Sequence, residues 1–453
     1  MKNHAGRCNA GSINKVKFVI HMDIAAKRSI VDYVAATKNE ILVDERLFSL
    51  LGTSPEVLGY LPRIPKWIGW GRRFPRLTRT MSHLIRFAWL CGGAVFLFSL
   101  NFVAAWARAP RAPRPRRNMS ADSKSYILAL SDRVEDIMGR SPFAEDPLFA
   151  DATWVCVPWV PMQSRPQRNH VDASSLLTRG DLFQAFIKSV TAVYVLWRHK
   201  HTSRWVLQSY TAFRWFVVRS ALEKLDGAMI TCEHYDRWAI LVDSTVGART
   251  RRHGGSGSGV EMILVQHGYM GGLGKDHEES LQLPIHRRLR AVSRMYLYDA
   301  AAKKFFMDAV VSRGRTRRGI ATTFFRPQIE LTAMPADKLV KILFVGHPLC
   351  EELHLSIINK LVHHARFAAY YKPHPKAAMS GKATAQEWTV INDPACFPAV
   401  DFLVSYPSTL VTEYEATGIP AQIHPLDLDP ANSDGLVRQI LDGIAMHQRR
   451  LSG

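Results

Sequence analysis

The stretch that decides the fold lies near the C-terminus, where KILFVGHP (residues 341–348) is followed by EELHLSIINKLVHHA (351–365) and FAAYYKPHP (367–375). A short apolar run, a segment with helical spacing and a second apolar run predict a strand, a helix and a strand. The chain continues with predicted strands at 388–393 and 401–407, a helix at 408–418, a strand at 419–425 and a helix at 433–448. This alternation is typical of a doubly wound parallel sheet, so we predict a C-terminal α/β domain over residues 338–453.

A second α/β domain is predicted upstream. KVKFVIHMD (15–23), AAKRSIVDYVAAT (25–37) and EILVDERLF (40–48) indicate a strand, a helix and a strand, which would start this domain within residues 1–56. Residues 122–325 would complete it, with a helix at 123–139, a strand at 152–160, a helical region at 181–225, and strands at 228–231 and 260–268. The Gly/Ser-rich segment at 247–259 predicts an exposed loop.

Positive charge is concentrated in the segment that separates residues 1–56 from residues 122–325. The chain has 453 residues, and 59 Lys and Arg against 39 Asp and Glu give it a net charge of +20. Residues 57–121 hold twelve Lys and Arg and no acidic residue, around the apolar centre FAWLCGGAVFLFSLNFVAAWA (87–107). As a helix this centre would be ~30 Å long, about one hydrocarbon core. Both flanks are basic, which favours a helix held on an anionic membrane surface over a simple span.

Two other interpretations of this insert stay open. A buried core helix between two solvated basic loops would show the same pattern. A nucleic-acid-binding arm is disfavoured, because the basic residues flank an apolar helix and do not alternate with groove-reading polar side chains. We therefore expect an anionic membrane surface as a partner, and no nucleic acid.

Cysteine usage and the N-terminus bear on the compartment. Six scattered cysteines without a CxxC pair predict neither a zinc site nor a disulfide framework. The first residues lack an apolar segment followed by a small-residue cleavage site, so we expect no secretory signal. The sequence therefore predicts a cytoplasmic protein associated with the inner face of the membrane.

Doubly wound sheets bind ligands at the carboxyl ends of their strands, so the residues that follow each predicted strand are candidate site residues. His374 ends YYKPHPK, and Lys372 and Lys376 beside it suit a nucleotide phosphate. His347, in the second His-Pro pair, would lie near the same phosphates. Either histidine can instead be an ordinary turn residue.

The next strand end offers further polar groups. Ser408 and Thr409 open a predicted helix, whose N-terminal N–H groups and dipole favour an anion, and a hydroxyl there can cap the helix. Glu413, one turn later, would reach a ribose hydroxyl.

A general base is expected in the first domain. His267 follows the strand ILVQHG, and an imidazole with a pKa of ~6.5 can take the proton of an attacking hydroxyl near neutral pH. A hydrogen bond from His267 to a neighbouring loop explains the residue equally well. Glu233, after AMIT, is the rival base, and Asp23 is a more distant one.

LVQHG, KPHPK and SYPSTLVTEYEATGIP, in this order, resemble the GT-B transferases that build surface polysaccharides. The most similar groups are the capsule-type sialic acid and Kdo transferases with a His-Pro motif and the CDP-glycerol glycerophosphotransferases. The resemblance covers roughly residues 226–425. It implies two Rossmann-like domains facing a cleft, with the basic apolar helical insert in the first domain and the donor nucleotide on the second.

The resemblance also implies a reaction. It would be inverting transfer of a sugar from a nucleotide-activated donor, with CMP or CDP favoured, to a polysaccharide or lipid-linked acceptor. No cofactor is expected, and the lack of a DxD-like pair beside a strand end is consistent with a metal-independent reaction. Glycerophosphotransferases usually carry a Trp-His-Gly-Thr-like stretch, whereas this chain reads Gln266-His267-Gly268-Tyr269. Transfer of a polyol phosphate is therefore the alternative, together with a non-catalytic role in polysaccharide binding or assembly.

Overall fold

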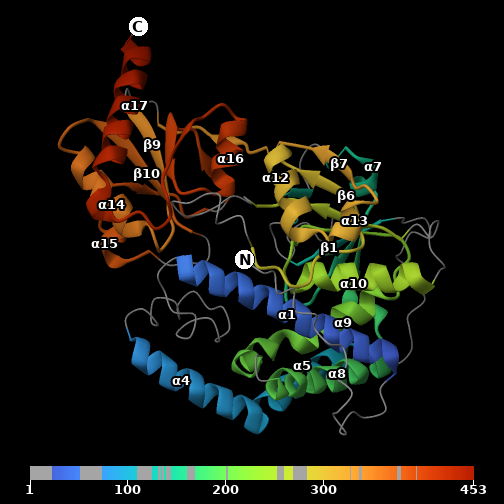
Figure 1. Ribbon diagram of the computed structural model, residues 1–453. Coiled ribbons are helices and arrows are strands. Elements are labelled where there is room, and N and C mark those ends of the chain that lie inside the picture. Colours follow the sequence, from blue (N-terminus) through green and yellow to red (C-terminus); the bar gives the residue numbers. More distant parts are fainter. Residues whose placement is uncertain are drawn as a thin grey trace, which may run out of the picture.

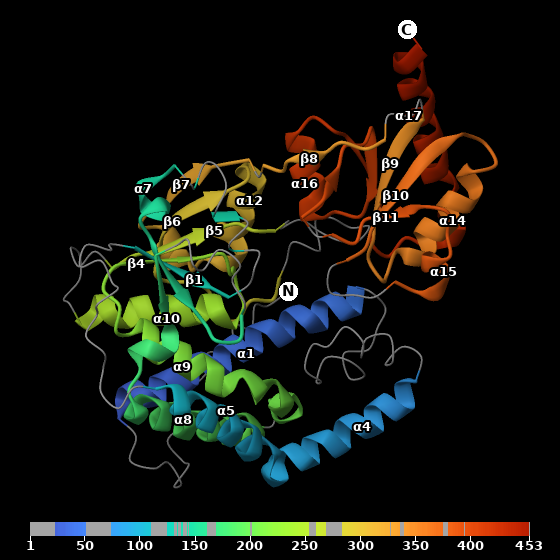
Figure 2. The ribbon, with the colours of Figure 1, turned by 180° about the vertical axis from the view of Figure 1, so that it is seen from behind.

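The computed structural model of the protein describes most of the chain. The described residues are 23–50, 74–109, 125–130, 134, 137–138, 143, 145–160, 169–199, 202–252, 260–268, 283–326, 328–335, 339–374, 379–393 and 395–452. They form two lobes that lie side by side, each built around a parallel sheet (Figures 1 and 2). The α/β fold class with two sheet-containing domains is therefore confirmed. The predicted cleft and the exact domain boundaries stay predictions.

The first sheet has the strand order β3-β2-β1-β4-β5-β6-β7, and each neighbouring pair is parallel. Its first six strands have the 3-2-1-4-5-6 order of a doubly wound sheet. The strands are β1 (Ser125–Ala129), β2 (Thr153–Cys156), β3 (His170–Asp172), β4 (Ala228–Thr231), β5 (Met262–Val265), β6 (Val292–Leu297) and β7 (Ala321–Phe324).

The second sheet has the order β11-β10-β9-β13-β14 and is also parallel throughout. Its strands are β9 (Val340–Val345), β10 (Phe367–Lys372), β11 (Thr389–Val390), β13 (Phe402–Ser405) and β14 (Ala421–Ile423). A separate two-stranded ribbon pairs β8 (Leu331–Thr332) with β12 (Phe397–Pro398).

Both domains also contain helices. In the first they are α1 (Ile24–Leu50), α4 (Pro75–Ala88), α5 (Ala94–Arg108), α7 (Pro147–Ala150), α8 (Arg179–Arg198), α9 (Ala212–Leu222), α10 (Arg237–Arg252), α12 (Ala300–Phe305) and α13 (Arg313–Thr316). In the second they are α14 (Glu351–Leu361), α15 (Gly381–Thr384), α16 (Thr409–Ala416) and α17 (Asp434–Ser452). Shorter 3₁₀ segments are Ala173–Leu176, Ser203–Thr211 and Pro430–Asn432, and Phe306–Val310 is a π-helical turn.

The central strands are buried on both faces, which is why they appear in the sequence as continuous apolar runs. In β5, Met262 and Leu264 pack against the helical layer that includes α8 and α9, whereas Ile263 and Val265 pack into the core on the other face. Phe344 and Leu343 of β9 divide in the same way between two cores of the second domain.

Buried charges fasten α1 to the first domain. Arg237, at the start of α10, donates from Nε to both carboxylate oxygens of Glu40 at 2.8 Å each. Both side chains are largely or fully buried. Asp32 accepts from Arg219 of α9 at 3.2 Å and pairs with Arg287 at 3.2 Å. The first helix is thus tied to chain segments 187 (Arg219) and 197 (Arg237) residues away, and to Arg287 still further along the chain.

The apolar insert is a bent helix. A π-helical turn, Trp89–Gly93, joins α4 to α5. Its Gly92 has a backbone φ of 141°, which residues other than glycine rarely adopt. One face of α5 packs on α8, and its Phe98 is fully buried. The other face is open to solvent through Val95, Phe96, Leu100 and Val103. The helix Arg79–Arg108 is long and apolar enough to cross a membrane, and only 11% of its apolar window is buried.

Three predicted elements of the first domain are wrong. The segment 40–48, predicted as a strand, forms the end of α1, where Glu40 and Asn39 bond to other parts of the domain. The segment 123–139, predicted as a helix, contains the central strand β1, which pairs with β2 and β4. Residues 247–252 of the predicted loop at 247–259 instead belong to α10, which continues to Arg252, and the rest of that loop lies outside the described residues. The strand predicted at 15–23 lies outside the described residues except for Asp23.

Replacing Glu40 with Gln should lower the free energy of unfolding by about 3–5 kcal/mol, because it leaves the buried guanidinium of Arg237 without a compensating charge. Denaturant titration monitored by circular dichroism measures the change. Asp308→Asn, which breaks the exposed Lys304–Asp308 pair at 2.7 Å, is the matched control and should have no measurable effect. Equal stability of the two variants would contradict a fastening role for Glu40.

Candidate functional site

The second domain gathers polar side chains where its strand order reverses. From β9 the chain continues to β10 on one side, and β13 lies on the other side. His347 follows β9, His374 follows β10, and Tyr406 follows β13. The rings of His347 and His374 meet edge to face with centroids 5.2 Å apart, and the ring of Tyr406 lies 5.3 Å from that of His347. The structure therefore brings the two predicted histidines together at the edge where such sheets bind ligands.

The local hydrogen bonds place the proton of the neutral His347 ring. The backbone N–H of Leu349 donates to Nδ1 of His347 at 3.2 Å, so this nitrogen is an acceptor. The neutral ring then carries its proton on Nε2. His347 is consequently a hydrogen-bond donor through Nε2, which is the form that suits a phosphate oxygen.

Lys372 has a different setting from the one that its sequence position suggests. Its ammonium donates to the carbonyl oxygens of Asp393 at 2.9 Å and Cys396 at 2.7 Å, and lies 5.1 Å from the centre of the Phe397 ring. Burial lowers its pKa, against the opposing effect of nearby acidic groups that include Glu413. Lys372 thus holds the loop before β12, and its predicted phosphate contact stays a prediction. Lys376 lies outside the described residues.

Ser408 and Thr409 begin α16 as predicted. Ser408 has an extended backbone, with φ −141° and ψ 161°, and the backbone N–H of Val411 donates to its carbonyl oxygen at 3.2 Å. Its hydroxyl makes no capping hydrogen bond, contrary to the role that we expected, and lies 3.3 Å from the hydroxyl of Ser405. The N-terminus of α16 points its dipole toward the same edge that carries His347, because β13 pairs with β9.

In the first domain, His267 follows β5 and stacks on a second histidine. The rings of His267 and His234 have centroids 4.3 Å apart, and the backbone N–H of His267 donates to Nε2 of His234 at 3.3 Å. Nδ1 of His267 is hydrogen bonded to the carbonyl oxygen of Cys232. A carbonyl only accepts, so Nδ1 carries the proton and Nε2 carries the lone pair. This is the tautomer that a general base needs.

The rival bases have other surroundings. Glu233 is half-buried after β4, and its backbone N–H donates to the hydroxyl of Thr231 at 3.1 Å. Asp23 accepts from the backbone N–H of Ala26 at 2.6 Å and so caps the start of α1. Of the three predicted bases, His267 has the most clearly defined hydrogen-bonding form.

Sequence reasoning missed two residues beside His267 that shape its surroundings. Buried Gln266 donates to the carbonyl oxygen of Gly268 at 2.9 Å and accepts from the backbone N–H of Tyr298 at 2.9 Å. It fixes the turn that presents His267. His234 was missed because it lies three residues beyond β4, although the strand-end rule that found Glu233 also covers it.

A cluster that the cysteine spacing did not predict lies in the second domain. The side chains of Cys350, His354 and His424 are all buried, and one potential ligand atom from each lies within 4.8 Å of the others. A thiol and two imidazoles are typical ligands of zinc and similar ions. The spacing gave no signal because His424 is 70 residues away from His354.

No family model matches the chain, and no curated protein matches it. Among solved structures, the chain is similar to one from a study of enzymatic glycosyl transfer with retention by trehalose-6-phosphate synthase. The two share 12% sequence identity with a TM-score of 0.37, over 73% of this chain and 94% of the other. The fold assignment rests on the strand orders described above, since a similarity at this level assigns neither a fold nor a reaction.

Replacing Gly346 with Ala should destabilise the second domain by about 1–3 kcal/mol, because a Cβ there would overlap the hydroxyl oxygen of Tyr371. Tyr371 cannot easily move, since it is buried and stacked on Trp388 with ring centroids 4.2 Å apart. Thermal unfolding measures the effect. Gly381→Ala, at a helical position with open space around it, is the matched control. If both variants unfold at the wild-type temperature, Tyr371 does not confine the turn at His347.

Proposed function

We propose that the protein is a transferase that moves a glycosyl unit from a nucleotide-activated donor to a hydroxyl of a surface-polysaccharide or lipid-linked acceptor. The observation that supports this most is the edge-to-face pair of His347 and His374 at the point where the strand order of the second sheet reverses. Nucleotides bind at this place in doubly wound sheets.

The donor would bind to the second domain through its phosphate groups. His347 offers Nε2–H, His374 lies against it, and the N-terminus of α16 adds a positive dipole end. Glu413, in the second turn of α16, would contact the ribose. CMP and CDP donors are favoured because the His-Pro motif resembles that of transferases which use them.

The acceptor would lose its proton to the first domain. Nε2 of His267 takes the hydroxyl proton as the oxygen attacks the anomeric carbon of the donor, with Glu233 as the alternative base. The new C–O bond forms while the bond between that carbon and the donor phosphate oxygen breaks, and the nucleotide leaves with the electron pair. His347, His374 and the dipole of α16 stabilise the charge on the departing phosphate. A single displacement of this kind inverts the anomeric carbon and needs no catalytic metal.

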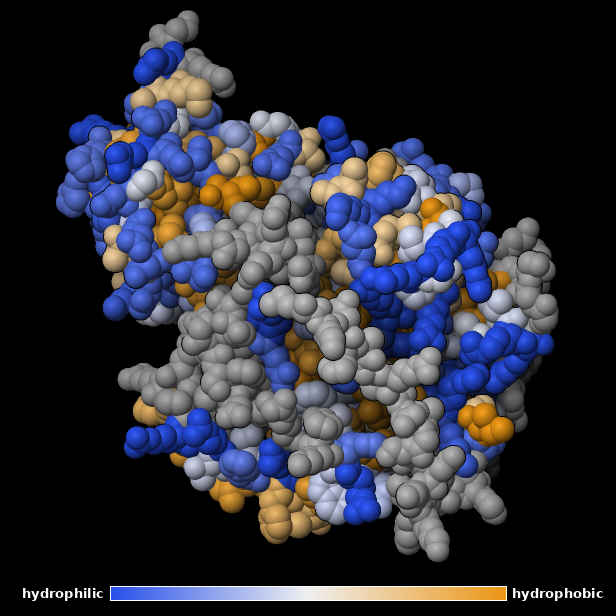
Figure 3. All heavy atoms as spheres, in the orientation of Figure 1, coloured by the Kyte–Doolittle hydropathy of each residue, from blue (hydrophilic) through white to orange (hydrophobic). Residues whose placement is uncertain are grey.

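The exposed face of α5 would hold the enzyme at the inner face of the membrane, where a lipid-linked acceptor is available. Figure 3 shows hydrophobic residues along the lower edge of the molecule, where α4 runs, and the exposed residues there include Leu84 and Phe87. Arg76, Arg79 and Arg86 on α4 suit anionic lipid headgroups. An apolar helix face bordered by arginines is typical of helices that lie in a membrane interface.

The reaction is tested with purified protein and a panel of CMP-, CDP-, UDP- and GDP-activated donors. His267→Gln should lower kcat by about 10²–10⁴ while donor binding, measured by calorimetry, is unchanged. His374→Ala should weaken donor binding. His363→Ala, which alters an exposed histidine in the same domain, is the control and should behave as the wild type.

Several outcomes would contradict this assignment. Nucleotide binding without turnover of any donor indicates a non-catalytic assembly protein. Transfer of a polyol phosphate, or interconversion of a UDP-sugar without an acceptor, identifies a different enzyme. Retention at the anomeric carbon, determined by NMR of the product, excludes the single displacement with His267 as base.

Membrane attachment is tested by substitutions on the open face of α5. Phe96, Leu100 and Val103 are 67%, 53% and 63% exposed, so changing all three to Gln should weaken binding to vesicles with anionic lipids and leave the fold intact. Sedimentation with phosphatidylglycerol vesicles measures the bound fraction. Val362→Gln with Ile423→Gln, at similarly exposed positions of the second domain, is the control. Undiminished binding of the triple variant would show that α5 is not the attachment site.

A further inference from the structure

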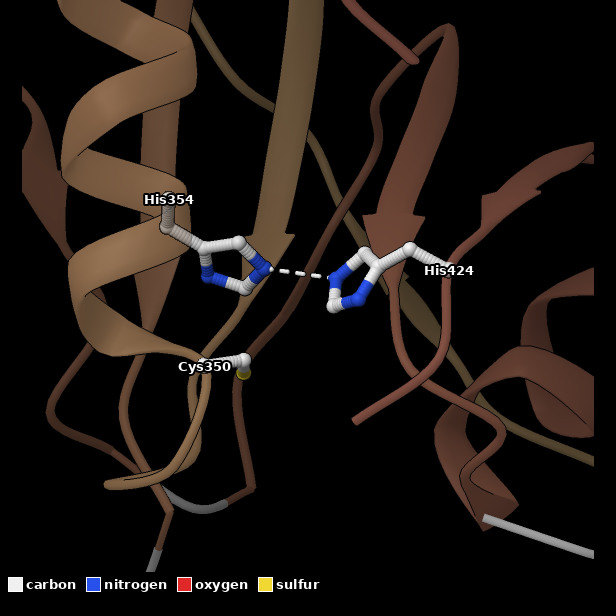
Figure 4. Close-up of side chains that lie close together, drawn as sticks. All are labelled: Cys350, His354 and His424. Atoms are coloured by element: carbon white, nitrogen blue, oxygen red, sulfur yellow. Dashed lines mark hydrogen bonds between the residues drawn. The ribbon is translucent and has the colours of Figure 1, made fainter. Parts of the chain in front are cut away.

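The cluster of Cys350, His354 and His424 joins two parts of the second domain beneath its predicted donor-binding edge. Cys350 immediately precedes α14, His354 lies one helical turn later, and His424 follows β14. Figure 4 shows the two imidazoles facing each other, with Cys350 below His354. The three side chains belong to residues that are 0%, 0% and 2% exposed.

The hydrogen bonds of the two imidazoles leave one buried ring nitrogen without a partner. Nδ1 of His424 lies 2.9 Å from the carbonyl oxygen of Pro425, so this nitrogen carries the proton and its Nε2 carries a lone pair. That lone pair faces Nε2 of His354 at 2.9 Å, which must therefore donate. The Nδ1 atom of His354 is then a buried acceptor, and it has no hydrogen-bond partner in the described part of the chain. Leaving a buried polar atom unsatisfied costs about 1–3 kcal/mol.

The thiol of Cys350 is similarly uncommitted. Its Sγ donates a weak hydrogen bond of 3.5 Å to the carbonyl oxygen of His347. Burial raises the pKa of this thiol to about 12. Burial also lowers the pKa values of His354 and His424.

We propose that Cys350, His354 and His424 bind one zinc ion, or an ion of similar preference, as a structural site. Zinc takes a thiolate sulfur at ~2.3 Å and imidazole nitrogens at ~2.0–2.1 Å, so the ligand atoms of a tetrahedral site lie ~3.3–3.6 Å apart. The ligand atoms lie within 4.8 Å of one another, so side-chain rotations must bring them closer by roughly 1 Å. The hydrogen bond between the two imidazoles would break, because Nε2 of His424 would turn its lone pair to the ion. On binding, the thiol releases its proton to solvent and the sulfur donates an electron pair to the ion. A water molecule would complete the tetrahedron.

The surroundings fit a structural role. The bond from Nδ1 of His424 to the carbonyl oxygen of Pro425 orients the imidazole, as the second hydrogen bond of a metal-binding histidine usually does. Phe344 and Tyr371 lie against His354, which keeps bulk water away. The backbone N–H of Cys350 donates to the carbonyl oxygen of His347 at 3.0 Å. The ion would therefore brace the turn that carries His347, without taking part in the reaction proposed above.

The test uses the full-length protein and needs no substrate. Protein purified from zinc-supplemented medium should contain about one equivalent of zinc, and removal of the ion by a chelator should lower the unfolding midpoint. Cobalt added to the stripped protein should give a thiolate-to-cobalt charge-transfer band and tetrahedral d–d bands. Cys350→Ser should lose the charge-transfer band, and His424→Gln should lose the tetrahedral spectrum. Cys91→Ser, which changes an exposed cysteine, is the control and should keep both.

X-ray absorption of the zinc-loaded wild type covers the case in which a variant does not fold. It should show one sulfur at ~2.3 Å and nitrogen ligands at ~2.0–2.1 Å. A folded wild type that binds neither ion, or a charge-transfer band that persists in Cys350→Ser, would overturn the proposal. Neither result depends on whether the protein transfers a sugar.

Discussion

Both domains depend on the geometry of parallel strands. Successive parallel strands need a crossover, and crossovers cover both faces of the sheet with helices or long segments. The central strands are therefore buried on both sides, as β5 and β9 are. The same geometry brings the carboxyl ends of all strands to one edge. His347, His374 and Ser408 come from three distant parts of the chain, and the pairing of β9 with β10 and β13 is what makes them neighbours.

A second layer of organisation comes from charge. The first domain buries Asp32, Asp243, Arg219 and Arg237 among apolar helices, and each has a charged or backbone partner. Such pairs add little net stability compared with an apolar core, but an unpaired member is strongly destabilising. The pairs therefore fix where α1 lies, because a position that separates the partners would leave a charge buried alone. The excess positive charge of the chain therefore does not come from its buried residues, because the buried acidic and basic side chains in the described part of the first domain are nearly equal in number.

The sequence predicted the second domain well and the first domain less well, for a physical reason. In the second domain, buried strands and amphipathic helices alternate with clear turn residues, so β9, α14, β10 and β13 all fall where predicted. In the first domain, the central strand β1 is SYILA, whose composition suits a helix equally well, and only its pairing with β2 and β4 decides. The segment 40–48 is rich in apolar residues, but contacts of Asn39 and Glu40 with Tyr235, Arg237 and Arg287 make it a helix.

The candidate sites were also predicted only in part. The rule that ligands bind after strands pointed to His267, His347 and His374 from the sequence alone. The sequence did not show which ring nitrogen of a histidine carries the proton. In His267 this is decided by the hydrogen bond between Nδ1 and the carbonyl oxygen of Cys232. Nor did it contain the cluster around His354, because a contact between residues 70 positions apart leaves no local pattern. For Lys372, the position after a strand suggested a phosphate contact, whereas its ammonium donates to the carbonyl oxygens of Asp393 and Cys396 in a loop.

The distant partners of α1 have a consequence for folding during synthesis on the ribosome. Asn39 exchanges two hydrogen bonds with the backbone of Arg287, 248 residues later. At a synthesis rate of ~5–20 residues per second, α1 waits roughly ten to fifty seconds before that partner leaves the ribosome. Within this interval α5 emerges first, and α8 (Arg179–Arg198), which covers one of its faces, begins only 71 residues after α5 ends at Arg108. The apolar helix therefore meets its surroundings, whether a chaperone or a lipid surface, before it meets the rest of its own domain.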